Sequence, residues 1–300
     1  MTEFKGKKTA VALGNFDGIH KGHLAVINKA VIQKDNGLLP CIVTFDEHPQ
    51  KMLRGESPKK LMSESLYEKE AEKIGCKTIK LSFESVRNMT PEEFFLEILV
   101  KKLNAGFVSC GFNYRFGKCG KGNAETLLEL CNKNGIGFSC SDGVCYEDEN
   151  ISSTRIRKAV ESGDIENANK MLGRYFSYDF EVVTGDRIGA KVLGFPTINQ
   201  IFPDDHIVPK SGVYASVTEV DGIIYPSMTN IGKRPTVGGE QLRSETCIIG
   251  FSGDLYGTNT PVGLISYIRD EEKFPSLEAL SAQLKKDSEK AEKIFNEVFR

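Results

Sequence analysis

The first half of the chain alternates short apolar runs with longer amphipathic stretches. The runs have the length of buried strands, and the stretches between them repeat apolar residues at helical spacing. This alternation predicts βαβ units and a parallel sheet, and such sheets bind ligands beyond the carboxyl ends of their strands. We expect strands over 9–13, 41–45, 78–81, 107–110 and 137–139, and helices over 23–36, 65–74, 91–103 and 124–134.

Capping residues mark several of the predicted helices. Thr90 can cap the helix over 91–103, because a proline suits the first helical position and two glutamates follow it in the first turn. The stretch 151–171 predicts two further helices, which are separated at 163–164 and end at Gly173.

After Tyr175 the pattern changes to short β-rich runs separated by Gly, Pro and Asp. Such runs are typical of an antiparallel barrel or sandwich, and a charged amphipathic helix over 276–298 is expected to cover it. The change predicts two domains, an α/β domain over residues 1–175 and a β-rich domain over 176–300. The strands expected in the second domain span 180–184, 213–220, 223–228, 246–249 and 262–268.

The composition narrows the class of protein. The 300 residues are 40% apolar and 27% charged with a net charge of −2, which is typical of a globular chain and gives no reason to expect nucleic-acid or membrane partners. No apolar run approaches the roughly 20 residues of a membrane span, and the first residues lack a signal-peptide core. We therefore expect a cytoplasmic protein. Its eight cysteines form no CxxC pair and are expected to be reduced thiols, several of them in core strands.

The decapeptide GNFDGIHKGH follows the first predicted strand. Gly14, Gly18 and Gly22 allow tight turning and close approach of the backbone to phosphate oxygens. His20 and His23 lie one helical turn apart, so both rings can reach the same ligand. Fixed donors at that point stabilise the charge that builds on an α-phosphate during in-line attack, and the motif therefore predicts a nucleotidyl-transfer site.

Two later segments strengthen this prediction. In ISSTRIR, hydroxyl groups and arginines gather at a helix start, where they can bind phosphates. In GFNYRFG, Asn113 and aromatic residues follow a strand, at the edge of the sheet where a base or ring can stack.

The β-rich half contains a second set of phosphate-binding features. Gly185, Gly189 and Lys191 are spaced as in a loop that folds over phosphates. Thr197 and Asn199 alternate along an extended segment, so their side chains face the same way. Two neutral oxygens on that face can hold a Mg²⁺ ion whose coordination the ATP phosphates complete.

Four segments of the first half carry a family resemblance. GNFDGIHKGH, VTFDEHP, GFNYRFG and ISSTRIR, in this order, resemble the adenylyltransferase module of bacterial bifunctional riboflavin kinase/FAD synthetases, a Rossmann-like domain of the HxGH nucleotidyltransferase superfamily. The resemblance implies that His20 and His23 contact the ATP phosphates. The other residues expected at the nucleotide are Gly14, Phe16, Asp17, Gly18, Asn113 and, for the departing pyrophosphate, Ser153, Thr154 and Arg157.

The second half is similar to the riboflavin kinase module of the same enzymes. SGVYASV, TNIGKRPT, SETCIIGFSGDLYG and YIRDEEKF follow in order, and the resemblance implies a six-stranded antiparallel barrel with a C-terminal helix. It also implies that Glu245 is the general base that takes the proton of the riboflavin 5′-hydroxyl. We expect flavin contacts from Phe116 in the first domain and from Arg269 in the second.

Loop 118–123 departs from the family pattern. Gly120 stands where an arginine is common and Asn123 replaces an aspartate, whereas Lys121 can supply a positive charge. We expect these changes to affect FMN binding more than the reaction itself.

The combined expectation is a cytoplasmic enzyme, monomeric or weakly homo-oligomeric, that converts riboflavin to FMN and FMN to FAD with ATP and Mg²⁺. Two alternatives remain open. In one, only one half of the chain is active. In the other, the protein keeps the fold but senses flavin without turning over ATP. Aminoacyl-tRNA synthetases of the HIGH type share the first motif but need a KMSKS-like loop, which the sequence lacks.

Overall fold

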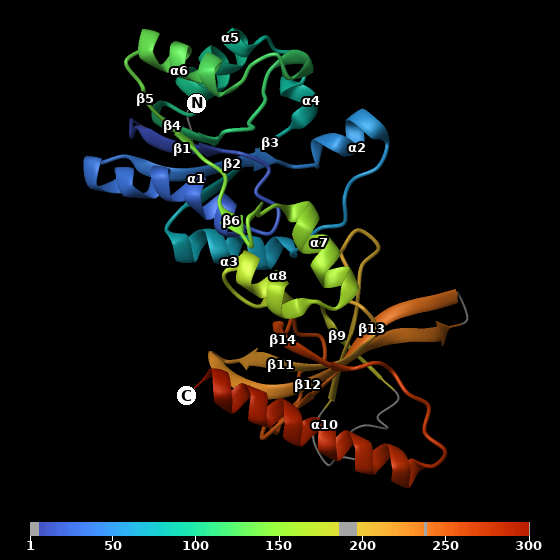
Figure 1. Cartoon of the computed structure of the whole chain (residues 1–300). Helices are drawn as coiled ribbons and strands as arrows, with labels where there is room; N and C mark the ends of the chain where they lie inside the picture. The colour runs from blue at the N-terminus through green and yellow to red at the C-terminus, as the bar shows by residue number, and fades with distance from the viewer. Residues whose placement is uncertain (1–5, 186–196, 237–238, 300) are drawn as a thin grey trace. The chain divides into compact units, whose positions relative to one another are not determined.

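The computed structural model describes residues 6–185, 197–236 and 239–299, and the chain forms two compact units (Figure 1). The first, called the α/β unit here, contains Met1–Pro58 and Tyr67–Ser152. The second, called the β-rich unit, contains Lys59–Leu66 and Ser153–Arg300. The functional boundary expected after residue 175 stays a prediction.

A five-stranded parallel sheet organises the α/β unit, as predicted. Its order is β3-β2-β1-β4-β5, so the direction of strand succession reverses between β1 and β4. In open α/β sheets this switch point opens a crevice at the carboxyl ends of the two strands. The strands are β1 (Thr9–Leu13), β2 (Leu39–Phe45), β3 (Lys77–Leu81), β4 (Ala105–Gly111) and β5 (Gly137–Ser141).

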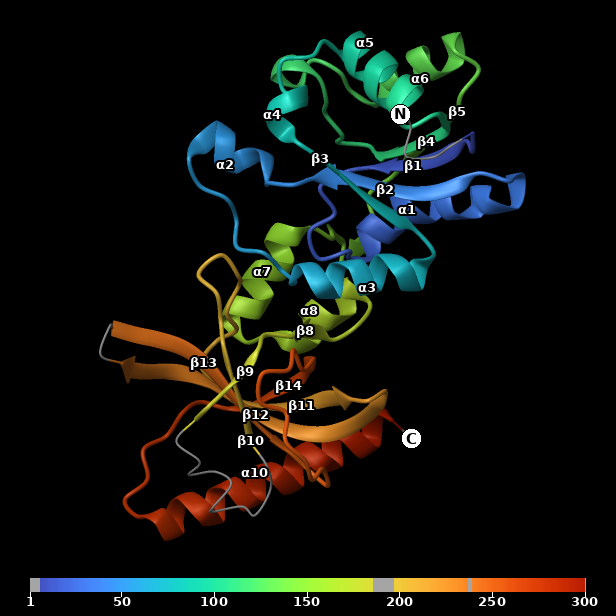
Figure 2. The same ribbon diagram turned by 180° about the vertical axis from the view of Figure 1, so that it is seen from behind.

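Helices cover both faces of this sheet (Figures 1 and 2). Helix α1 (Lys21–Val31) lies on one face, where the hydroxyls of Ser109 and Ser141 donate to its carbonyls at 3.0 and 3.1 Å. The helical segment η2 (Phe94–Lys102) and α6 (Ala124–Lys133) cover the other face and bury the core around Val11, Leu13 and Val43. The remaining elements are η1 (Ile32–Asn36), α2 (Pro49–Arg54), α3 (Glu64–Ile74), α4 (Phe83–Val86), α5 (Pro91–Glu93), η3 (Lys118–Gly120), β6 (Cys145–Tyr146) and β7 (Glu149–Asn150).

The helix predicted over 91–103 starts as expected and then changes type. Thr90 and Glu93 form a capping box, in which the Thr90 hydroxyl accepts from the Glu93 amide at 3.1 Å and the Glu93 carboxylate accepts from the Thr90 amide at 2.8 Å. After Glu93 the chain continues as a π-helix, with the Leu103 amide bonded to the Ile98 carbonyl five residues earlier. The helical segment is confirmed, and only its π-helical type was not predicted. Apolar residues of this segment such as Phe94, Ile98 and Leu103 lie in the core.

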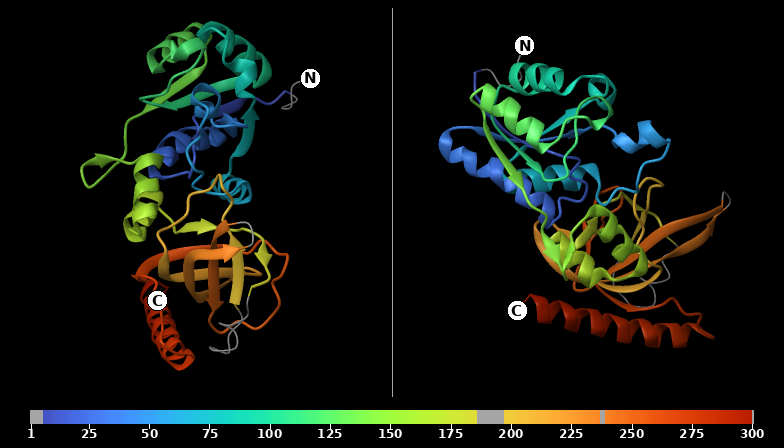
Figure 3. Two further views of the ribbon diagram at one scale, coloured as in Figure 1. Left: turned by 90° about the vertical axis from the view of Figure 1, so that its right-hand side faces the viewer. Right: turned by 45° about the horizontal axis from the view of Figure 1, so that its top comes forward.

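The β-rich unit is a curled antiparallel sheet of seven strands among the described residues (Figure 3). Its order is β8-β14-β11-β12-β13-β10-β9. Only residues 179–181 separate β8 from β9, although the two strands lie at opposite ends of this order, so the sheet curls until its edges approach each other. The strands are β8 (Phe176–Tyr178), β9 (Val182–Val183), β10 (Thr197–Ile201), β11 (Gly212–Val220), β12 (Ile223–Thr236), β13 (Gly239–Ile248) and β14 (Val262–Arg269).

The expectation of six strands was therefore wrong. The pattern predicted a single strand over 180–184. The structure has β9 within this segment, paired with β10, and a further edge strand before it, β8, paired with β14. Two-residue and three-residue edge strands leave almost no periodic signal in a sequence. The C-terminal helix is present as α10 (Leu277–Val298), where the Ser276 hydroxyl accepts from the Ala279 amide at 3.2 Å.

The two helices predicted over 151–171 form, and they open the second part of the β-rich unit, whereas the sequence placed them in the first domain. They are α7 (Ser153–Ser162) and α8 (Ile165–Leu172), and α8 ends at Gly173, whose φ of 81° suits glycine. The sequence did not predict that residues 59–66 belong to the β-rich unit. These residues join this unit because Lys60 pairs with the 205–207 segment and the hydroxyls of Ser63 and Ser65 bond the buried Asp179 carboxylate.

Several cysteines lie in core strands, as predicted. None of the eight cysteines forms a disulfide in the described part of the chain, and Cys41, Cys110 and Cys247 lie in the buried strands β2, β4 and β13. Among the same residues, no helix is long and apolar enough to cross a bilayer.

Candidate active sites

The turn after β1 carries the first candidate site. Its start is fixed by two bonds to β2: the Gly14 amide donates to the Val43 carbonyl at 3.3 Å, and the Thr44 hydroxyl donates to the Asn15 carbonyl at 3.0 Å. Phe16 and Ile19 adopt positive φ values of 48° and 33°. Such values are costly for residues other than glycine, and they persist where the surroundings enforce them, often at functional sites.

His20 is the residue that this turn places at the start of α1. Its Nδ1 accepts from the His23 amide at 3.2 Å, so a neutral His20 ring carries its proton on Nε2. The ring is 4% exposed and stacks on His23 with 3.5 Å between centroids. The two histidines that the sequence singled out are thus side by side, and the Phe16 ring lies nearly perpendicular to that of His23 with 5.3 Å between their centroids.

Steric contacts and backbone conformation explain why glycine occupies three positions of this motif. A Cβ on Gly22 would lie 3.1 Å from two atoms of the His20 ring, and a Cβ on Gly14 would lie 2.8 Å from the Phe16 ring. Gly18 has a φ of 81°. Phe16 is 2% exposed, so its ring packs in the interior, and Asp17 is half-buried. Nucleotide contacts by these residues stay predictions.

The loop after β4 forms the wall of an aromatic cavity of about 410 Å³. Phe116 is 6% exposed, and its ring lies parallel to that of Tyr114 at 5.9 Å. Burial raises the pKa of the Tyr114 hydroxyl well above its usual value. Asn113 is exposed on the same loop and is not among the lining residues. The lining residues are Phe45, Pro49, Phe83, Val86, Arg87, Asn88, Phe94, Tyr114, Arg115, Phe116, Gly117, Lys118, Cys119 and Gly120.

Loop 118–123 is closed by the backbone. Phe116 and Gly122 exchange two amide-to-carbonyl bonds of 3.1 and 3.0 Å, and a Cβ on Gly122 would lie 2.6 Å from the Phe116 ring. Asn123 caps α6, because its Oδ1 accepts from the Thr126 amide at 2.9 Å. Lys118 lines the cavity, whereas Lys121 does not. The cavity is therefore aromatic in its walls and has cations at Arg87, Arg115 and Lys118.

The first turns of α7 carry the third predicted phosphate-binding segment. Ser153 begins the helix and is half-buried, Thr154 is exposed, and the Arg157 Nε donates to the Lys59 carbonyl at 2.6 Å. These residues belong to the β-rich unit, whereas the histidines belong to the α/β unit. Their convergence on one ATP molecule stays a prediction.

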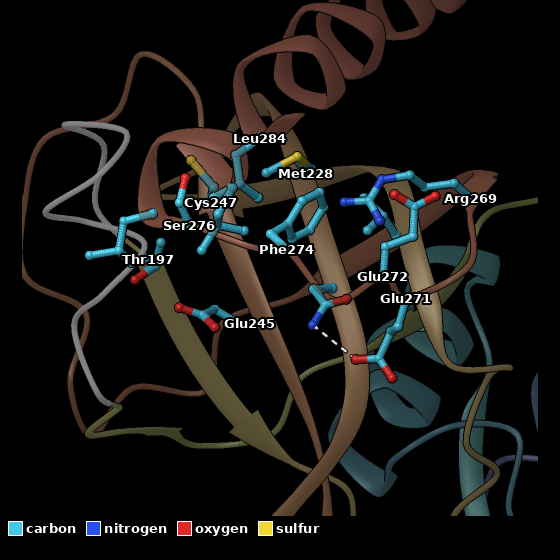
Figure 4. A pocket seen from close by; sticks show the side chains of 14 residues that line it. Thr197, Met228, Glu245, Cys247, Arg269, Glu271, Glu272, Phe274, Ser276 and Leu284 are labelled. Atoms are coloured by element: carbon cyan, nitrogen blue, oxygen red, sulfur yellow. Dashed lines mark hydrogen bonds between the residues drawn. The ribbon is translucent and has the colours of Figure 1, made fainter. Parts of the chain in front are cut away.

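The β-rich unit holds a cavity of about 550 Å³ between its sheet and α10 (Figure 4). Apolar side chains of the sheet, such as Val213 and Met228, face apolar side chains of the helix across it. Its rim carries the polar groups of Glu245, Arg269 and Glu271. The full lining is Thr197, Val213, Met228, Asn230, Glu245, Cys247, Arg269, Glu271, Glu272, Phe274, Ser276, Leu277, Leu280 and Leu284.

Glu245 also lines a second, smaller cavity of about 210 Å³. In the sheet Glu245 on β13 lies opposite Asn199 on β10 and Asn230 on β12. This carboxylate therefore stands where an apolar cavity meets a polar one. The residues around the smaller cavity are Asn199, Asn230, Gly232, Lys233, Arg243, Glu245 and Glu271.

Thr197 and Asn199 are placed as the sequence predicted, two residues apart on β10. Asn199 is 3% exposed, and a Cβ on Gly185 would overlap its amide, so the backbone at Gly185 lies directly against this side chain. Gly189 and Lys191 lie outside the described residues. Thr197 lines the larger cavity and Asn199 lines the smaller, polar one. Two neutral side-chain oxygens on one face of a strand fit a Mg²⁺ ion that takes its other ligands from phosphates. Among the described residues no cluster of three or more His, Cys, Asp and Glu side chains could hold a metal.

Sequence reasoning missed four polar residues of the second site. Asn230, Lys233, Arg243 and Glu271 line the smaller cavity, and the Asn230 amide lies 3.4 Å from the Glu271 carboxylate (Figure 4). All except Arg243 lie within TNIGKRPT and YIRDEEKF, segments that carry the resemblance, but neither motif alone shows which side chains face a cavity.

Known proteins and protein families match both units of the chain. A family model described as FAD synthetase matches residues 3–155, and one described as riboflavin kinase matches residues 172–295. The chain is 33% identical to a bifunctional riboflavin kinase/FMN adenylyltransferase of Bacillus subtilis, over 97% of this chain and 94% of the relative. It is 31% identical to the protein of the same description from Escherichia coli K12, over 95% and 92%.

A solved structure has the same fold. The crystal structure described as a macrolide-efflux protein from Streptococcus pneumoniae matches with a TM-score of 0.83 and 32% identity, over 95% of this chain and 93% of that one. The efflux description concerns that protein, and the likeness is one of fold and sequence.

Proposed function

The chain belongs to the bifunctional riboflavin kinase/FMN adenylyltransferase family, and from this premise we infer that the β-rich unit phosphorylates riboflavin to FMN and the α/β unit adenylylates FMN to FAD. Both steps use ATP, the first releasing ADP and the second pyrophosphate. The observation that carries the proposal is the position of Glu245, which lines both an apolar cavity large enough for a ring system and a polar cavity suited to phosphates.

In the kinase step, Glu245 accepts the proton of the riboflavin 5′-hydroxyl as that oxygen attacks the γ-phosphate. The apolar cavity under α10 holds the flavin ring, and the polar cavity receives the phosphates near Lys233 and Arg243. Arg269 lines the flavin cavity, and three of its five N–H groups bond Asp287 and the Asp270 carbonyl. It can still donate two N–H groups to a flavin.

Thr197 and Asn199 would hold Mg²⁺ through their side-chain oxygens. The bound ion would neutralise charge on the ATP phosphates. The described part of the nucleotide loop, Gly185, adjoins Asn199 and supports this placement.

In the adenylyl step, the FMN phosphate is itself an anionic nucleophile, so no protein nucleophile is needed. The rings of His20 and His23 stack at the carboxyl end of β1, next to the switch point of the sheet, and their ring nitrogens are the proposed donors. These donors would stabilise the charge that builds on the α-phosphate oxygens. Asn113 follows β4 in the same unit and would add a polar side chain to the proposed ATP site. For Ser153, Thr154 and Arg157 on α7, the pyrophosphate contact rests on the family resemblance.

The aromatic cavity of the α/β unit is the proposed FMN site. Tyr114 and Phe116 offer ring surfaces for an isoalloxazine, and Arg87, Arg115 and Lys118 offer positive charge for its phosphate. Gly120 and the closed loop leave these cations in place, so we propose that the departure in loop 118–123 is compatible with FMN binding. We further propose that the protein acts in the cytoplasm, as a monomer or weak homo-oligomer, with a functional boundary after residue 175.

The test starts with the full chain, riboflavin, ATP and MgCl₂, followed by chromatography of FMN and FAD. We expect both products from the unmodified protein. His20→Ala should stop FAD formation and spare FMN formation, and Glu245→Ala should do the reverse. Flavin binding without ADP release would support a sensor and contradict the proposal, and one missing product in the unmodified protein would support an enzyme with a single active half.

A further inference from the structure

One wall of the flavin cavity is the helix α10, which is anchored by contacts further along its length. Leu277, Leu280 and Leu284 of α10 line the cavity. Further along the helix, Ala291 is 0% exposed and belongs to the core that includes Val213 on β11. The end of the helix over the cavity is much less covered, since Leu277 is 65% exposed. Leu284 packs against this core, whereas the end of the helix at Leu277 has little packing of its own to hold it.

A buried ion pair lies between these two parts of α10. Asp287 is 3% exposed, and its Oδ2 accepts from the Nε and Nη2 of Arg269 at 2.9 and 2.7 Å. Its Oδ1 accepts from Gln283 at 2.9 Å, one turn nearer the cavity. Arg269 is the last residue of β14, so the pair ties the sheet directly to the helix.

Arg269 also contacts residues at the cavity. Its Nη1 donates to the Asp270 carbonyl at 2.9 Å, and its guanidinium lies 5.6 Å from the Phe274 ring centroid. Both Arg269 and Phe274 line the flavin cavity, whereas Asp287 does not (Figure 4). Asp287 thus touches the cavity only through Arg269 and through its own helix.

We propose that Asp287 is a positioning residue of the riboflavin kinase site, which orients Arg269 and docks α10 so that the leucine wall closes over the flavin. This inference rests on the proposed function of the β-rich unit. A carboxylate with two N–H donors on one oxygen and a third on the other has its orientation fixed, and charge-assisted bonds of this kind are the stronger ones in proteins. The effect falls on flavin binding, because the pair joins β14 to α10, whereas the reacting groups Glu245, Thr197 and Asn199 lie on β13 and β10.

The experiment compares steady-state kinetics of the full chain and of Asp287→Asn, with riboflavin varied at saturating ATP. Asparagine keeps the volume and loses the charge. We expect the KM for riboflavin to rise about tenfold, the fold-change of one charge-assisted bond, while kcat and the KM for ATP change less than about threefold. A purely structural role would instead reduce the folded fraction, which lowers the apparent kcat and leaves KM unchanged.

Two further variants guard against misfolding and non-specific effects. Gln283→Ala removes only the bond to Oδ1 and should raise the riboflavin KM about threefold, in the same direction and by less. Glu289→Gln, an exposed carboxylate on the same helix, is the matched control and should change nothing. FMN adenylylation by the same preparations should be unaffected.

The results distinguish failure of the proposed kinase function from failure of the positioning role of Asp287. An unmodified protein that forms no FMN overturns the proposed function and this inference with it. An active unmodified protein combined with an Asp287→Asn variant of unchanged riboflavin KM overturns the positioning role alone. The same holds if Gln283→Ala or Asp287→Asn lowers only kcat.

Discussion

Gly22→Ala tests whether the HxGH motif needs glycine at this position to leave space for the His20 ring, and not for helix formation. Gly22 is the second residue of α1, a position where alanine is the better helix former by about 1 kcal/mol. Its missing Cβ faces the His20 ring, since a Cβ would lie 3.1 Å from both Cε1 and Nδ1, and 3.6 Å from the Ile151 carbonyl. The substitution therefore improves the helix and crowds the imidazole.

The magnitude follows from that distance. An ordinary carbon–carbon contact is about 3.5–4.0 Å, so the ring must move by a few tenths of an ångström, and its bond to the His23 amide must lengthen or bend. Because a displacement of about 1 Å can cost about a hundredfold in rate, we expect the kcat of FMN adenylylation to fall about tenfold. We expect thermal stability to rise or stay level, and riboflavin phosphorylation to remain unchanged.

The assay measures FAD formation from FMN and ATP alongside a thermal melt of the same preparation. Asn28→Ala, at an exposed position of the same helix, is the control and should raise stability without changing either rate. A Gly22→Ala protein that melts at the same or a higher temperature with unchanged FAD formation would refute the reasoning.

Three further predictions concern other parts of the molecule. Lys118→Gln should raise the KM for FMN about tenfold in adenylylation, whereas Lys121→Gln should not, because only the first lysine lines the proposed FMN cavity. Thr90→Ala should cost the α/β unit about 1 kcal/mol in urea unfolding through loss of the capping box. Burial raises the pKa of Cys247 to about 12, so its folded thiol stays protonated where the unfolded thiol ionises, and stability should fall as pH rises from about 9 to about 12. Cys247→Ala should remove up to about 1.4 kcal/mol per pH unit of that slope.

Each of these has a contrary result. Equal effects of the two lysine variants on the KM for FMN would contradict the cavity assignment. Unchanged unfolding of Thr90→Ala would mean that the π-helix after Glu93 holds this segment without its cap. An identical stability slope in Cys247→Ala would mean that this thiol is not protected from ionisation in the folded protein.

Local patterns predicted much of the fold. The five parallel strands of the first half appear where apolar runs predicted them, and Thr90, Gly173 and Ser276 mark helix ends by local hydrogen bonds or backbone conformation. The elements that were missed have little or no local signal. The π-helix after Glu93 depends on how the core is filled, and β8 and β9 are too short to show a period.

The first site was predictable residue by residue because its motif is local. His20 caps α1 and His23 lies in its first turn, three residues later, so the local sequence brings the two rings close, and the structure shows them stacked. The second site is not local. Glu245, Asn230 and Arg269 come from three strands, and only strand register places the first two side by side.

The sequence by itself determined the order of the elements, the histidine pair and the family, because these depend on neighbours in the chain and on motifs in fixed order. The tertiary structure decided which residues share a cavity, why Gly22 must lack a side chain and what Arg269 binds. Asp287 shows the reason: it lies 18 positions from Arg269 in the chain, and no period in the sequence connects a strand end to the buried face of a helix. Such contacts are fixed only when the sheet curls and α10 docks, and at that point they also shape the site.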